Sequence, residues 1–209
     1  MDCTDASVLL IDDDAAVRNG LVRLIRSAGW NATPFASAEE FLASDATDDL
    51  GCIVLDIRMP GLTGPELHAW MREHDISLPV IYLSGFCDIR TSVQAMKLGA
   101  SDVLEKPADA DVLLQAIAAA VERHRQDCSR RQASDAFGTR LGTLSVRERE
   151  VMNHVILGRL NKQIAADLGI SEKTVKVHRG RMMAKMRVRS VAELVHQCDQ
   201  FGIAEPEAA

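Results

Sequence analysis

Acidic, hydroxyl and basic side chains follow short apolar runs of this sequence, where together they could handle a phosphoryl group. The residues concerned are Asp12, Asp13, Asp14, Asp56, Ser84 and Lys106. Clustered carboxylates repel one another unless a cation lies among them, and oxygen ligands with retained waters suit Mg²⁺. A carboxylate beside Mg²⁺ can act as a nucleophile toward a phosphoryl group, because the metal offsets the charge of the incoming oxygens. Lys106 could pair with one phosphoryl oxygen as a point charge, and Ser84 could offer its hydroxyl to another.

The elements that must position these residues alternate over the first 125 residues. Five short apolar runs are typical of buried parallel strands, namely Val8–Ile11, Asn31–Phe35, Cys52–Leu55, Pro79–Leu83 and Asp102–Leu104. Amphipathic stretches between the runs predict helices, one of which opens with the capping box Ser37-x-x-Glu40. The pattern predicts a doubly wound α/β fold with a five-stranded parallel sheet. Ligands bind such a sheet outside the carboxyl ends of its strands, so the candidate residues would meet in one crevice.

Each of these signals has a simpler explanation when it is taken alone. The run Asp12–Asp14 could be a solvated turn, Asp56 a cap, and Lys106-Pro107 a common loop dipeptide. Their occurrence together at successive strand ends favours a functional site.

The C-terminal part has helical signals and no strand signal. Two capping boxes, Ser145-x-x-Glu148 and Ser190-x-x-Glu193, open helices, and Ser171 can cap a third. A short helix ending at Gly169, a tight turn and a longer helix form a helix-turn-helix pattern. Polar, glycine-containing residues before it predict a linker, into whose start the preceding helix can continue. We therefore expect an α/β domain, a linker and a small all-α domain of four helices, at residues 1–125, 126–143 and 144–209.

The distribution of charge and the number and spacing of cysteines narrow the classes of protein to which this chain can belong. Residues 1–139 carry 22 acidic and 12 basic side chains, whereas residues 140–209 carry 8 acidic and 12 basic ones. A basic module can bind a polyanion, although a basic face is usually only solvated surface. The five cysteines are odd in number and form no C-x-x-C pair, which argues against a disulfide framework or a zinc knuckle. With no secretory signal and no membrane-spanning run, we expect a cytoplasmic protein.

At the acidic and basic residues the chain resembles the receiver domain of bacterial response regulators. The matching segments are VLLIDDD at 8–14, CIVLDIRMPG at 52–61, YLSG at 82–85 and LEKP at 104–107. The resemblance implies a flavodoxin-like fold in which Asp56 accepts a phosphoryl group from a sensor histidine kinase. It implies that Ser84 and Lys106 contact that group. The Mg²⁺ ligands that it implies are Asp13, Asp56, Asp12 mainly through water, and the main-chain carbonyl of Arg58.

Residues 144–200 resemble the four-helix LuxR/FixJ type of helix-turn-helix domain. The segments that carry the resemblance are LSVREREVM, GRLNKQIAADLGISEKTVKVHRGRMMAKM and VRSVAELV. By that resemblance, the second helix of the motif enters the major groove of double-stranded DNA, and the last helix pairs two copies on two half-sites. Lys176 and Val177 are then the expected base contacts, and Lys162, Thr174 and His178 the expected phosphate contacts. The further candidates are Lys173, Arg179 and Arg181.

Three positions depart from these family patterns. Many receivers have an aromatic residue three positions before the lysine that swings inward on activation, and this chain has Val103 there. Many also have phenylalanine after the Lys-Pro pair, where this chain has Ala108. Gly180 replaces a larger polar residue of the recognition helix, which removes a base contact and costs about 1 kcal/mol of helix stability relative to alanine.

Together the two sets of motifs predict a two-component response regulator. Phosphorylation of Asp56 would shift the population toward a dimer that binds two half-sites and activates transcription, with RNA polymerase as a candidate further partner. A phosphatase of the haloacid dehalogenase type also uses a nucleophilic aspartate, but its general acid stands two positions later, where this chain has Arg58. We therefore expect no enzyme. The C-terminal motif disfavours a pure phosphorelay module, while Val103 leaves phosphorylation-independent DNA binding open.

Overall fold

The computed structural model describes residues 6–44, 51–85 and 89–202, with the side chains of 89–92 left out. The chain divides into two compact units, Met1–Cys128 and Ser129–Ala209. Within the described residues, none of the helices is both long enough and apolar enough to cross a membrane.

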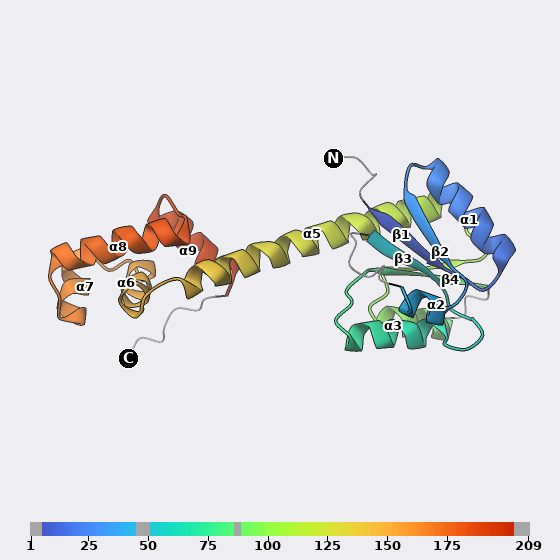
Figure 1. The fold of residues 1–209 in the computed structure, drawn as a ribbon, viewed down its shortest axis with the longest axis horizontal. Helices are drawn as coiled ribbons and strands as arrows, with labels where there is room; N and C mark the ends of the chain where they lie inside the picture. Colours follow the sequence, from blue (N-terminus) through green and yellow to red (C-terminus); the bar gives the residue numbers. More distant parts are fainter. Residues whose placement is uncertain (1–5, 45–50, 86–88, 203–209) are drawn as a thin grey trace. The chain divides into compact units, whose positions relative to one another are not determined.

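The first unit is built on a five-stranded sheet (Figure 1). Its strands are β1 (Ser7–Ile11), β2 (Asn31–Phe35), β3 (Gly51–Asp56), β4 (Val80–Ser84) and β5 (Asp102–Glu105). All neighbouring strands are parallel, in the order β2-β1-β3-β4-β5. Every residue of β3 and β4 is buried, which explains why their sequences read as continuous apolar runs. The predicted α/β class and the five predicted strands are confirmed, with no strand end differing by more than one residue.

Helices cover both faces of this sheet. They are α1 (Ala15–Ser27), α2 (Ala38–Leu42), α3 (Gly64–Glu73), α4 (Ile89–Lys97) and the first part of α5 (Ala110–Gly142). One face packs against α2, α3 and α4, through residues such as Phe41, Leu67 and Ala95. The other face packs against α1 and α5, through residues such as Ile25 and Ile117. The sheet therefore lies between two layers of helices.

The segment 126–143, which was expected to be helical only near its start, is helical almost throughout, because helix α5 continues to Gly142. Polar residues and two glycines suggested irregular chain, but the segment contains no proline, and seven of its eighteen residues are alanine, arginine or glutamine, which favour helices. Phe137 is 2% exposed and, with Leu141, packs into the core of the second unit. This tertiary burial outweighs the weak local propensity of the glycines.

The second unit consists of helices around a small core. After the end of α5 they are α6 (Val146–Ile156), α7 (Asn161–Leu168), α8 (Glu172–Met186) and α9 (Val191–Gln200). Ser145, Ser171 and Ser190 each accept a hydrogen bond from the backbone N–H three residues later, as predicted. Gly169 ends α7 with φ 65°, a conformation that favours glycine and makes the tight turn into α8.

Candidate functional site

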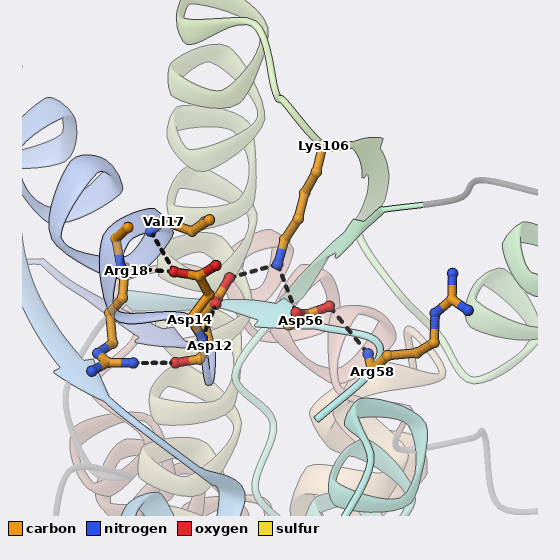
Figure 2. A network of polar contacts seen from close by, with 8 residues as sticks. Asp12, Asp14, Val17, Arg18, Asp56, Arg58 and Lys106 are labelled. Carbon is orange, nitrogen blue, oxygen red and sulfur yellow. Dashed lines mark hydrogen bonds and ion pairs between the residues drawn. The ribbon is translucent and has the colours of Figure 1, made fainter. Parts of the chain in front are cut away.

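The carboxyl ends of β1 and β3 bring three aspartates together. Carboxylate oxygens of Asp12, Asp13 and Asp56 all lie within 4.8 Å of one another. Asp12 is fully buried and Asp56 is 7% exposed, whereas Asp13 is exposed. Asp14 belongs to the neighbouring helix instead, because its side chain accepts hydrogen bonds from the first turn of α1 (Figure 2). The cluster therefore holds three carboxylates, of which one faces solvent.

Lys106 reaches between two of these carboxylates from the loop after β5 (Figure 2). Its Nζ donates to Asp12 Oδ2 and to Asp56 Oδ2, each at 2.6 Å. Burial raises the pKa of Asp12, and the hydrogen bond from Lys106 offsets only part of that rise. Burial alone would lower the pKa of Lys106, but its bonds to both carboxylates outweigh burial and raise it. Lys106 thus stays a cation at the centre of the site.

Ser84 is the last residue of β4 and lies at the same end of the sheet. The residue is 1% exposed, and its carbonyl oxygen accepts from the Lys106 N–H at 2.8 Å. Its neighbour Leu83 pairs in register with Asp56 on β3. The carboxyl end of the sheet therefore brings together Asp12, Asp56, Ser84 and Lys106, as the order of strand ends predicted.

Main-chain and helix contacts hold the acidic residues in place. The Asp12 carbonyl oxygen accepts from Arg18 of α1 at 2.6 Å. Asp56 Oδ1 accepts from the backbone N–H of Arg58 at 3.1 Å, while the Arg58 guanidinium points away from the carboxylates (Figure 2). Only the main chain of Arg58 therefore lies at the site. Sequence reasoning missed Arg18, whose one signal is its place on the first turns of the helix that follows Asp12.

Gly64 lets helix α3 begin against the strand that carries Asp56. A Cβ atom at this position would collide with the Asp56 carbonyl oxygen and lie 3.1 Å from Ile57 Cα. The Gly64 N–H donates to the Ile57 carbonyl oxygen at 3.1 Å. Because both obstacles are backbone, a side chain here must displace the end of β3. The sequence alone did not predict this role of Gly64, although a glycine eight residues after a candidate nucleophile was the available signal.

Helix α8 carries the basic surface of the second unit. It contains five basic residues and one acidic residue. The predicted DNA-contacting residues that are exposed are Lys162, Lys173, Lys176, Val177 and Arg181. Thr174, His178 and Arg179 are only partly exposed. Arg179 donates to Asn161 Oδ1 at 3.0 Å, and Thr174 Oγ1 lies 2.8 Å from Ser171 Oγ. Two of the predicted DNA-contacting residues, Arg179 and Thr174, therefore make side-chain contacts within the second unit.

An ion pair between an exposed lysine, Lys185, and a buried carboxylate, Glu148, connects α8 to the start of α6. Glu148 is 3% exposed, and its Oε2 accepts from Lys185 Nζ at 2.6 Å and from the Ser145 N–H at 2.8 Å. The Lys185 bond, followed by the Ser145 bond, lowers the pKa of Glu148 from its ordinary 4.5 to about 2. Lys185 also donates to the Thr143 carbonyl oxygen at 2.9 Å. The capping box predicted at Ser145 is confirmed and carries an additional charge pair.

This pair makes the stability of the second unit depend on pH. Because the folded state lowers the pKa of Glu148, the stabilisation is complete above pH 4.5 and is lost as the pH falls toward 2. We expect Glu148→Gln to be less stable than wild type by about 2 kcal/mol at pH 7, with the gap closing in acid. Urea unfolding followed by circular dichroism between pH 7 and pH 3 measures this. Glu150→Gln, on the same helix, is the control, and a gap that stays constant with pH would contradict the assignment.

Gly180 lies at a position of α8 where a side chain would have free space around it. A Cβ atom there would meet nothing within 4 Å, and the residue is exposed. Gly180→Ala is therefore expected to stabilise the unit by about 1 kcal/mol, through helix propensity alone. Thermal unfolding measures the gain, and Ala184→Gly on the same helix should produce a loss of similar size. A destabilised Gly180→Ala protein would show that this position is not open.

Comparisons with known proteins match both units. Residues 8–118 match the family "Response regulator receiver domain", and residues 142–198 match "Bacterial regulatory proteins, luxR family". Nodulation protein W of Bradyrhizobium diazoefficiens is 41% identical, over 96% of this chain and 88% of its own length. Transcriptional regulatory protein FixJ of Azorhizobium caulinodans is 41% identical, over 97% of this chain and 96% of its own.

Two solved structures of response regulators are similar to this chain over most of its length. The response regulator StyR superposes with a TM-score of 0.87 at 39% identity, covering 94% of this chain and 99% of that one. Full-length FixJ from B. japonicum has a TM-score of 0.60 at 38% identity, covering 96% and 99%. The chain therefore belongs to the FixJ-type family of two-component response regulators, in which a receiver domain is joined to a LuxR-type DNA-binding domain.

Proposed function

We propose that Asp56 accepts a phosphoryl group from a sensor histidine kinase and that this event controls DNA binding by the second unit. The observation that carries the proposal is Lys106 Nζ at 2.6 Å from the carboxylates of both Asp12 and Asp56, which are buried. The carboxylates of Asp12, Asp13 and Asp56 can hold a metal ion, and the Lys106 ammonium group can pair with an anionic ligand. The site therefore suits a negatively charged ligand that binds together with a metal ion. The family regulates transcription through its LuxR-type domain and is not a class of enzymes.

The chemistry follows from the positions of the side chains. A carboxylate oxygen of Asp56 forms the new bond to phosphorus as the bond between phosphorus and the kinase histidine nitrogen breaks, and the nitrogen keeps the electron pair. Lys106 can then exchange a carboxylate contact for a phosphoryl oxygen, and Ser84 can donate its hydroxyl to another. The donor set fits Mg²⁺, since Asp12, Asp13, Asp56 and the main-chain carbonyl of Arg58 offer only oxygens. Bound there, the ion supplies charge neutralisation between carboxylates and phosphoryl oxygens.

Helix α8 gives the second half of the proposal. In the major groove, Lys176 and Val177 are the proposed base contacts, since both side chains are exposed on this helix. The proposed phosphate contacts are Lys162, Lys173, Thr174, His178, Arg179 and Arg181. Two copies paired through α9 would bind two half-sites, so phosphorylation that favours pairing would raise DNA affinity and activate transcription.

Intact-protein mass spectrometry after incubation with acetyl phosphate and Mg²⁺ tests the first step. One added phosphoryl group is expected on wild type and on Asp135→Asn, whose exposed aspartate lies on α5. No addition is expected on Asp56→Asn. If Asp56→Asn gains the group as well, or wild type fails to gain it even from a phosphorylated histidine kinase, the assignment of Asp56 is wrong.

A further inference from the structure

A hydrogen bond between two side chains crosses the interior of the receiver unit. Tyr82, in the middle of β4, is fully buried, and His68 of α3 is 5% exposed. Tyr82 Oη lies 3.1 Å from His68 Nδ1. Both belong to the layer between the sheet and α3, where their neighbours are apolar side chains such as Leu67 and Met71. A hydroxyl and an imidazole are costly to bury there unless they satisfy one another.

The two residues belong to elements that end at the phosphoryl site. Tyr82 stands two residues before Ser84, so both side chains point to the same face of the sheet. His68 stands one helical turn after Gly64, whose backbone abuts the Asp56 carbonyl group. The hydrogen bond therefore connects the strand that carries Ser84 with the helix that rests on the Asp56 strand.

The main-chain bonds of β4 act within the sheet, whereas side chains make the contact between the sheet and α3. The end of β4 is held by Ile57 N–H to the Leu83 carbonyl at 3.0 Å and by Lys106 N–H to the Ser84 carbonyl at 2.8 Å. Such ladder bonds lie in the plane of the sheet. They do not set the separation between the sheet and the helix layer above it. At the level of Tyr82 the register partner on β5 is Val103, which has no polar group to make such a link.

We propose that the Tyr82–His68 hydrogen bond positions Ser84 relative to Asp56, so that both residues are positioning residues for phosphoryl transfer. The inference rests on the proposed function of Asp56. A misplacement of a reacting group by about 1 Å can lower a reaction rate on the order of 10²-fold. The hydrogen bond between the sheet and α3 can therefore affect the rate of phosphoryl transfer without contacting the reacting atoms. Burial, with Arg72 nearby, lowers the pKa of His68, so the bond joins two neutral groups at pH 7.

The test uses the full chain with acetyl phosphate and Mg²⁺, and follows the rate constants for gain and loss of the phosphoryl group by intact mass. Tyr82→Phe keeps the ring and removes only Oη, and His68→Leu removes the imidazole. We expect each to change at least one rate constant by about tenfold. The double variant should be no worse than either single one, because the two residues act through one bond. His68→Gln retains a polar partner for Oη and should return both rates to within about twofold of wild type.

The control separates positioning from loss of stability. Ile117 is buried against the opposite face of the sheet, so Ile117→Val should lower the melting temperature without altering either rate constant. If Tyr82→Phe reacts at wild-type rates, or if Ile117→Val of equal stability changes the rates as much, the inference is overturned. Failure of the proposed function would look different, because wild type would gain no phosphoryl group or Asp56→Asn would gain one. Either of those results overturns both proposals.

Discussion

Replacing Lys106 by methionine is expected to destabilise the receiver unit by about 3 kcal/mol when no divalent cation is present. In wild type its Nζ lies 2.6 Å from both Asp12 and Asp56, which are 0% and 7% exposed. Methionine keeps an unbranched side chain, one atom shorter, but leaves two adjacent buried carboxylates without a counter-charge. The pKa of Asp12, already raised by burial, should rise further, so the deficit should shrink in acid.

The chain offers a specific signal for this measurement. Its two tryptophans, Trp30 and Trp70, both lie in the first unit, so their fluorescence follows unfolding of the receiver alone. Lys97→Met, on the exposed surface of α4, removes the same charge and should change the free energy of unfolding by less than about 0.5 kcal/mol. Added Mg²⁺ should stabilise Lys106→Met more than wild type. Equal stability of the Lys106 and Lys97 variants would mean that Lys106 does not balance the acidic cluster.

Phe137→Ala should destabilise the DNA-binding unit by about 3 to 5 kcal/mol, although Phe137 lies outside the segment that matches the LuxR family. The ring is 2% exposed, and its centroid lies 5.0 Å from that of Phe201. Arg140 stands over it at 5.8 Å from the ring centroid. The end of α5 is thus part of the core of this unit, and a DNA-binding fragment that begins at residue 142 would lack it.

Two spectroscopic signals locate the effect of this change. Unfolding followed by circular dichroism at the helix band should show an early transition in Phe137→Ala, while the tryptophan transition of the receiver stays in place. Thr139→Ala, an exposed position two residues further along α5, should leave both transitions unchanged. A Phe137→Ala protein as stable as Thr139→Ala would show that Phe137 is not a core residue.

Strands and helix caps were predictable because they depend on local sequence. Burial on both faces gives β3 and β4 continuous apolar runs, and each serine cap depends on a residue three positions away. Strand β2, at the edge of the sheet, was identified mainly from its position, since it includes Pro34 and has only two buried residues. The continuation of α5 was not predictable from local polarity, because burial of Phe137 in a distant core decides it.

In the candidate site, too, some features were predictable from the local sequence and others were not. The order of strand ends was enough to predict that Asp12, Asp56 and Lys106 would meet. Contacts that cross from one layer to another were not predicted, including the Arg18 bond to the Asp12 carbonyl and the Tyr82–His68 bond. Such contacts depend on side-chain directions across the packed fold, which neither hydrophobic periodicity nor motif spacing encodes.

The most direct test of phosphorylation-controlled DNA binding is the affinity of one DNA duplex for phosphorylated and unphosphorylated full-length protein at a fixed salt concentration. The duplex can be selected from a random-sequence pool with the phosphorylated protein, and fluorescence anisotropy with sedimentation reports both affinity and self-association. We predict at least about tenfold tighter binding and a dimer for phosphorylated wild type, with Asp56→Asn unresponsive. Equal affinity and equal self-association in both states would contradict the account and leave a DNA-binding protein that works without phosphate.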